Sequence, residues 1–155
     1  MCAPLPPKDL PEKKMTDSIA ALSAADIIRL LDLRPHPEGG HFRETFRDPA
    51  QDANGRSVST LIYFLLPAGD VSRWHKVDAT EVWHFYAGAP LQISVSPNDS
   101  ETSVHRLGPD LTAGERPQFV VPAHCWQSAK TLGPWTSLAA PLRQASNFQA
   151  SKSLR

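Results

Sequence analysis

The apolar positions show a helical repeat close to the N-terminal end of the chain. Apolar residues recur at helical spacing over 27–31, and Ser23 with Asp26 three residues later resembles a capping box. Pro35 disfavours helical geometry in the residue before it, so the helix must end before this proline. The pattern therefore predicts one short helix.

Beyond residue 40 the period changes to two, which is typical of β-strands. The predicted strands are Phe42–Arg47, Val58–Leu66, Glu81–Tyr86, Leu91–Ser96, Ser103–Leu107, Gln118–Val121 and Trp135–Ala140. Asn54-Gly55 predicts a hairpin between the first two strands, and Pro122–Trp126 predicts a turn. Short strands at close spacing, separated by many of the 15 prolines, favour an all-β sandwich or small barrel.

Two of the predicted strands carry apolar residues on both faces. The second half of Val58–Leu66 is apolar throughout. In the strand that begins at Glu81, this residue shares one face with Trp83 and Phe85, while the intervening residues share the other face. Such strands need cover from a second sheet, a helix or a partner subunit. We therefore expect a homodimer.

Length and charge exclude several classes of protein. A chain of 155 residues has the size of a single domain. Its 16 basic residues balance 16 acidic ones, so it lacks the basic surface that nucleic-acid binding requires. The longest apolar run, Leu61–Leu66, is much shorter than the ~20 residues of a membrane-spanning helix. We predict neither a nucleic acid nor a membrane as partner.

The cysteines and the two ends of the chain suggest a reducing compartment. Cys2 and Cys125 cannot form a disulfide framework, and the charged N-terminal segment has no apolar region of a secretory signal. We therefore expect a cytoplasmic protein. Segments 1–21 and 144–155 are polar and weakly patterned, and we interpret them as tails on a folded domain of 22–143.

A spaced motif runs from Gly69 to Gly88. It reads Gly-x5-His75-x-Val77-x3-Glu81-x6-Gly and resembles the first motif of the cupin superfamily, Gly-x5-His-x-His-x3/4-Glu-x6-Gly. Val77 occupies the place of the second histidine. Strand alternation would put His75 and Val77 on one face, and a short turn would bring Glu81 inward from the next strand.

A weaker match begins at Gly114. Pro122, His124 and Gln127 resemble the second cupin motif, with His124 in the place of a turn glycine and Gln127 in the place of the last metal-ligand histidine. The spacing between Gly114 and Pro122 is longer than in the motif.

Five longer segments identify the family more specifically than these two motifs do. The segments His36–Gly40, Arg43–Thr45, Trp74–Val77, Glu81–Gly88 and Val120–Gln127 follow in that order. Together they resemble the cupin-5 group of RmlC-like cupins. This resemblance implies a cupin jelly-roll β-barrel, here with a short N-terminal helix. The match ends after Pro141–Arg143, so we expect the final strand of the family to be missing or replaced.

The resemblance also implies a small-molecule site in the mouth of the barrel. The RmlC-like epimerases use a pocket histidine to abstract a proton beside a carbonyl, which makes His75 the candidate base and Glu81 its partner. The candidate ligand-binding residues are Trp74, Trp83, Tyr63, Arg43 and Gln127. We interpret His36–Gly40 as a rigid turn that leads into the first long strand.

The sequence leaves two alternatives for the cofactor, none or a divalent metal. Metal-binding cupins, by the resemblance, use three histidines and a glutamate, whereas this chain offers His75, Glu81 and the weak donor Gln127. We expect no cofactor and keep a divalent metal as the alternative. Three functions stay open: a metal-independent isomerase or epimerase acting on a sugar-like or carbonyl metabolite, a non-catalytic metabolite-binding protein, and a metal-dependent cupin enzyme.

Overall fold

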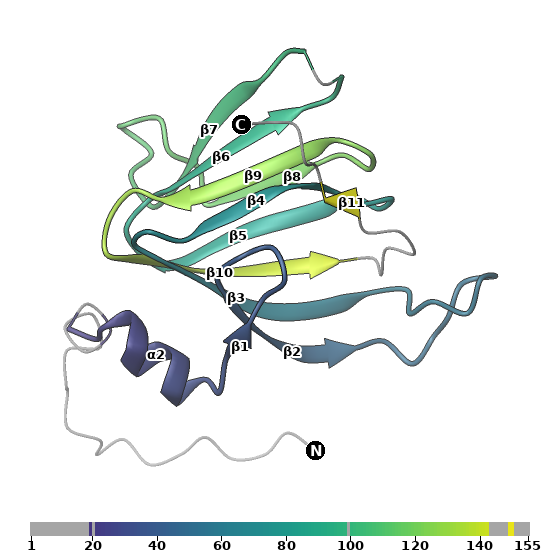
Figure 1. Cartoon of the computed structure of the whole chain (residues 1–155), viewed down its shortest axis with the longest axis horizontal. Helices are drawn as coiled ribbons and strands as arrows, with labels where there is room; N and C mark the ends of the chain where they lie inside the picture. The colour runs from purple at the N-terminus through teal and green to yellow at the C-terminus, as the bar shows by residue number, and fades with distance from the viewer. Residues whose placement is uncertain (1–18, 20, 99, 143–148, 151–155) are drawn as a thin grey trace, which may run out of the picture.

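A short helix and two β-sheets make up the computed structural model, which describes residues 19, 21–98, 100–142 and 149–150 (Figure 1). The elements are α2 (Ala24–Leu30), β1 (Arg34–Pro35), β2 (His41–Arg47), β3 (Thr60–Pro67), β4 (Val71–Lys76), β5 (Glu81–Gly88), β6 (Leu91–Ser96), β7 (Ser103–Leu107), β8 (Gln118–Val121), β9 (Trp126–Thr131), β10 (Trp135–Leu142) and β11 (Gln149–Ala150). Most of the two predicted tails, 1–21 and 144–155, lies outside the described residues.

The strands form an antiparallel jelly-roll sandwich. One sheet has the order β1-β2-β3-β10-β5-β8, and the other has the order β11-β4-β9-β6-β7. Consecutive strands such as β4 and β5 lie in different sheets, so the chain crosses repeatedly from one layer to the other. The predicted all-β jelly-roll with a short N-terminal helix is confirmed, although the described strands form two separate sheets and not one closed ring.

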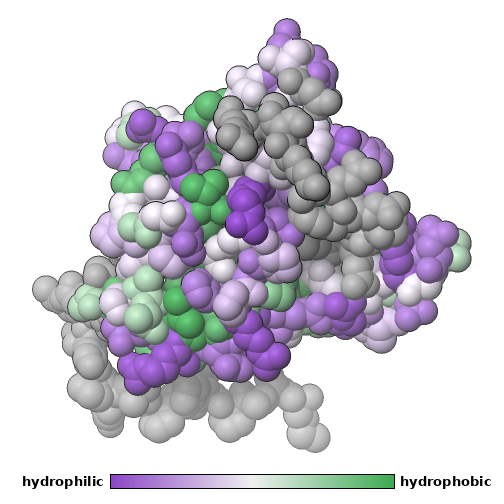
Figure 2. All heavy atoms as spheres, viewed as in Figure 1, coloured by the Kyte–Doolittle hydropathy of each residue, from purple (hydrophilic) through white to green (hydrophobic). Residues whose placement is uncertain are grey.

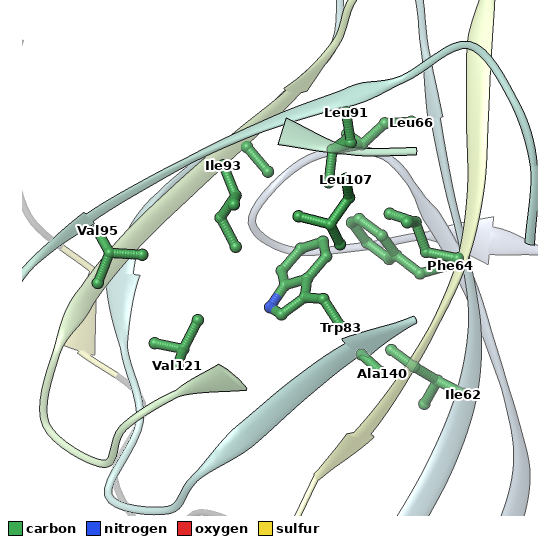
Figure 3. Close-up of a cluster of buried hydrophobic side chains, with 12 residues drawn as sticks. Ile62, Phe64, Leu66, Trp83, Leu91, Ile93, Val95, Leu107, Val121 and Ala140 are labelled. Carbon is green, nitrogen blue, oxygen red and sulfur yellow. The ribbon is translucent and has the colours of Figure 1, made fainter. Parts of the chain in front are cut away.

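The main core lies between the two sheets (Figure 3). Ile62, Phe64 and Trp83 come from the first sheet, and Ile93 and others meet them from the second. The rings of Phe64 and Trp83 pack edge to face with centroids 5.7 Å apart. Glu81, Trp83 and Phe85 all point inward, as their alternation along one strand predicts.

The helix α2 covers part of the outer face of the first sheet. Ser23 and Asp26 form the predicted capping box at its N-terminus. Its residue Ile27 packs in a second apolar cluster with Leu65 of β3 and Trp135 of β10. The helix thus supplies cover for the strand that the sequence shows to be apolar on both faces.

The strands β1, β4, β9 and β11 were not among the predicted ranges, although the motif at His75 and Val77 implied a strand at β4. The segment Trp126–Thr131 has small and polar residues between two turns, so it lacks an apolar alternation, yet β9 pairs with both β4 and β6 in the centre of its sheet. The short β11 pairs with β4 through Gln149 and Ala150. It lies beyond the point at which the family resemblance ends.

Polar residues dominate the face of the molecule seen in Figure 2, with apolar residues in small groups between them. Within the described ranges, no helix is both long enough and apolar enough to cross a membrane.

Candidate functional site

A cavity of about 240 Å³ opens between the two sheets. Its walls are largely apolar and include Phe42, Ile62, Phe64, Val77 and Trp83. Its polar lining consists of His36, Glu38, Glu44, Arg47, Thr60, Ser72, His75 and Glu81. An apolar hollow with a few convergent polar groups is the usual form of a small-molecule site.

His75 reaches the cavity from β4, where alternation places it on the same face as Val77. Its Nδ1 lies 2.7 Å from the backbone oxygen of Arg73. A carbonyl oxygen only accepts hydrogen bonds, so Nδ1 carries the hydrogen and Nε2 is the proton-accepting atom of the neutral ring. Burial lowers the pKa of His75, although the Arg73 carbonyl and the nearby Glu38 act in the opposite direction. The ring is therefore neutral at physiological pH.

Glu81 is held by two partners deep between the sheets. The indole Nε1 of Trp83 donates to Oε1 of Gln127 over 2.9 Å, which fixes the orientation of the amide. The amide Nε2 of Gln127 then donates to Oε2 of Glu81. Burial raises the pKa of Glu81 to about 7, and the Gln127 hydrogen bond only partly offsets this effect. Near neutral pH, much of Glu81 therefore carries a proton on its other oxygen, Oε1.

His36 and Glu38 form a second polar pair at the cavity. The Nδ1 of His36 lies 2.5 Å from Oε2 of Glu38, and the Glu38 side chain is almost wholly buried. The His36 ring also packs edge to face on Phe42, with centroids 4.7 Å apart. The sequence of this segment predicts only a turn. Its local pattern carries no sign of burial, because the burial comes from contact with β4.

The turn between β1 and β2 reaches across to β4 and so connects the two sheets (Figure 1). The backbone N–H of Arg73 donates to the Glu38 oxygen over 2.8 Å, and the Arg73 guanidinium donates to the Pro37 oxygen over 2.5 Å. These bonds place the His36–Glu38 pair in the same cavity as His75 and Glu81.

Of the predicted site residues, His75, Glu81 and Trp83 line the cavity, and Gln127 lies directly behind Glu81. The structure places the other predicted residues outside it. Trp74 lines a separate hollow of about 200 Å³ on the outer face of its sheet. The Arg43 guanidinium lies 5.7 Å from the centre of the Tyr63 ring, on the outer face of the other sheet.

Strand alternation explains this division. Trp74 precedes the inward-facing His75, and Tyr63 lies between Ile62 and Phe64, which both line the cavity. In a regular strand, the neighbour of an inward-facing residue faces outward. In β4, a register shift between Ser72 and His75 lets both of these residues line the cavity while Trp74 does not. Trp74, Tyr63 and Arg43 therefore do not line the cavity that contains His75 and Glu81.

The residues present do not fit the metal site of a metal-binding cupin. Val77 replaces one histidine with an apolar side chain, and both polar atoms of the Gln127 amide already bond to Trp83 and Glu81. Among the described residues, no group of three or more His, Cys, Asp or Glu side chains is arranged to hold a metal ion. This donor set differs from the three histidines and glutamate that the resemblance implies for a metal site.

His84 and His124, like His41 and His105, do not line the cavity. His84 faces away from Glu81, as the alternation predicts, and its Nδ1 lies 2.8 Å from Nε2 of Gln118. His124 has a φ of 67° in the turn before β9. It therefore adopts the left-handed backbone that suits the turn glycine of the second motif.

Comparison with known proteins agrees with this architecture. Residues 25–141 match the family model Cupin_5, described as the cupin superfamily (DUF985). The chain is 30% identical over 122 residues to the uncharacterized protein YML079W of Saccharomyces cerevisiae, a match that covers 69% of this chain and 60% of the yeast protein. The chain thus matches less than two thirds of the length of that relative.

Among solved structures, protein SO0799 from Shewanella oneidensis is similar with a TM-score of 0.79 and 34% identity, over 84% of this chain and 85% of that chain. A hypothetical protein from Leishmania major gives a TM-score of 0.74 at 24% identity, over 83% of this chain and 86% of that one. Oxalate decarboxylase from Bacillus subtilis shares the fold alone, with a TM-score of 0.55 and 14% identity over 79% of this chain and 30% of that chain. With its fold, its motif spacing and a family match over most of its length, this chain belongs to the Cupin_5 (DUF985) family of the cupin superfamily.

Proposed function

We propose that the cavity binds a small sugar-like or carbonyl-bearing metabolite, and that the protein acts on it as an isomerase or epimerase without a metal. The observation that carries this proposal is the pair His75 and Glu81, whose pKa values are shifted in opposite directions while both face one cavity. A base that is neutral and an acid that is protonated at the same pH are what enolisation requires.

In the proposed step, Nε2 of His75 removes a proton from the carbon beside the carbonyl group. The C–H bond breaks, an N–H bond forms, and the electron pair moves to make an enol. At the same time, Oε1 of Glu81 gives its proton to the carbonyl oxygen, so charge does not build up in the apolar cavity. With a hydroxyl group on the carbon that loses the proton, the enol is an enediol. His75 then gives its proton to the former carbonyl carbon while Glu81 takes the proton of the neighbouring hydroxyl, so the carbonyl group moves by one carbon and both side chains return to their starting states.

Substitution of His75 by Asn tests this assignment. Asn can still donate to the Arg73 carbonyl, as Nδ1 of His75 does, but it has no proton-accepting nitrogen. We expect deuterium uptake from heavy water into free aldoses and ketoses, followed by proton NMR, to fall by ~10²–10⁴-fold. Binding of the same sugars should change by only a few-fold.

The result separates the remaining functions. If the native protein binds a sugar yet never catalyses exchange, the cavity is a binding site without turnover. Elemental analysis of untagged protein tests the metal-dependent alternative. About one equivalent of a transition metal, with exchange lost on its removal, would contradict the metal-independent proposal.

We further propose that a second copy of the chain covers the outer face of the first sheet. Beyond α2, this face leaves Leu61, Tyr86 and Val120 with 40%, 55% and 54% of their surface exposed. Val120 pairs with Val82 across β8 and β5, so the apolar surface is continuous there.

Light scattering after gel filtration should give a molar mass twice that of one chain, and Val120→Glu should lower this molar mass toward that of a single chain. A single-chain mass for the native protein would contradict the dimer.

A further inference from the structure

In the described lining of the cavity, the basic side chains Arg47 and His36 are each paired with a carboxylate and offer little positive charge to a ligand. The three glutamates Glu38, Glu44 and Glu81 line the same cavity, and Arg47 is the sole Arg or Lys in the described part of the lining. Its Nε donates to Oε1 of Glu44 over 2.9 Å, and its Nη2 donates to Oε2 over 2.5 Å. The two side chains are 45% and 37% exposed, and this bidentate contact partly compensates the guanidinium charge at the mouth of the cavity.

The polar groups deeper in the cavity also oppose an anion. His36 pairs with Glu38 at 2.5 Å, so any charge on the ring is balanced by a buried carboxylate. Burial favours the neutral form of His75 and the protonated form of Glu81, and a bound anion would have to replace its water shell with these groups. Together, these polar groups can form hydrogen bonds with a neutral ligand, but they provide no positive charge to balance the negative charge of a phosphate or carboxylate.

The size of the cavity agrees with a small ligand. Its volume of about 240 Å³ is below the roughly 300–1,000 Å³ of pockets that take drug-sized molecules. Apolar rings from Phe42, Phe64 and Trp83 form much of the wall and can stack on the apolar faces of a sugar. A nucleotide-linked sugar would need both more room and a cationic partner for its phosphates.

We propose that the ligand of this cavity is an uncharged monosaccharide-sized molecule with hydroxyl and carbonyl groups, and that the Arg47–Glu44 pair excludes its phosphorylated and carboxylated forms. This inference rests on the proposed function, since it takes the cavity to hold a sugar-like or carbonyl metabolite. It adds a charge selection that the family fold does not specify.

The test compares each free sugar with its own charged derivatives. Glucose, glucose 6-phosphate and gluconate form one series, and xylose with xylose 5-phosphate forms another. Binding is followed through the indole N–H signal of Trp83, assigned with Trp83→Phe, because this residue lines the cavity. We expect one of the neutral sugars to bind and its charged derivatives to bind at least ~30-fold more weakly, about 2 kcal/mol.

Glu44→Gln is the decisive variant, because it removes the carboxylate that pairs with Arg47 and keeps a side chain of nearly the same size in the cavity lining. The phosphorylated sugar should then gain about tenfold in affinity relative to the neutral one. Glu101→Gln changes the net charge by the same amount at an exposed residue and should leave the ratio unchanged.

The outcomes separate the two proposals. If the native protein binds the phosphates or gluconate as tightly as the free sugars, the charge selection is wrong while the sugar-binding function stands. If neither the native protein nor Glu44→Gln binds any member of either series, both the ligand class and the proposed function are overturned. If Glu44→Gln leaves the ratio of affinities unchanged, Arg47 and Glu44 do not set the selection.

Discussion

Gly39→Ala is expected to destabilise the protein by more than about 4 kcal/mol and to abolish ligand binding. Gly39 has a φ of +110°, and a Cβ added there would collide with the backbone oxygen of Val71. Backbone atoms cannot yield as a flexible side chain would, so the turn must move away from β4. That movement would break the Arg73–Glu38 backbone bond and displace the His36–Glu38 pair from the cavity. Urea unfolding followed by tryptophan fluorescence measures the loss.

Gly69→Ala is the matched control for this variant. Gly69 also has a positive φ, +89°, but a Cβ added there meets nothing within 4 Å. Only the strain of the left-handed backbone remains, about 1–2 kcal/mol. Equal losses in the two variants would show that the turn does not depend on its close approach to β4, and would contradict the role that we assign to Gly39.

The second large effect is a pH dependence of stability that Glu81→Gln should remove. The pKa of Glu81 is about 7 in the folded protein against an ordinary value of 4.5, so the folded state binds the proton more tightly than the unfolded chain. Stability from this group is complete below pH ~4.5 and is lost as the pH rises to ~7. The loss is about 3 kcal/mol in the free energy of unfolding, or roughly 10 °C in Tm.

The measurement compares the native protein with Glu81→Gln at a series of pH values. The difference in unfolding free energy between them should change by about 3 kcal/mol between pH ~4.5 and pH ~7, and then stay constant. His75, whose lowered pKa favours stability at higher pH, is present in both proteins and cancels in the difference. Glu101→Gln, which removes one carboxylate at an exposed position, is the matched control. A difference that does not vary with pH would mean that Glu81 titrates normally.

The roles of Glu81 and Gly39 differ in how far the sequence alone predicts them. Glu81 is recognisable from the sequence because it is a carboxylate on the same strand face as Trp83 and Phe85. Its unusual pKa follows from that burial. The structural importance of Gly39 is different, because the backbone it meets belongs to residue 71, far along the chain.

Helix capping and strand alternation are local, so the sequence alone predicts them. The capping box at Ser23, the inward faces of β4 and β5, and the outward direction of His84 all follow from neighbouring residues. The outward placement of Trp74 depends in addition on the register shift between Ser72 and His75, which lets both of those residues line the cavity. The family motifs added the jelly-roll connections between these strands.

Contacts between distant segments were decided by the tertiary structure. Gln127 lies opposite His75 in the pairing of β4 with β9, and its amide joins Trp83 to Glu81 across the two sheets. The strand β9 has no apolar alternation of its own, so local pattern does not predict it. Its place is set by pairing with β4 and β6 on either side. Glu38 is buried only because its turn folds over β4. A sequence pattern reports which way a side chain points within its own element, whereas the environment of a buried polar group depends on register and packing between elements far apart in the chain.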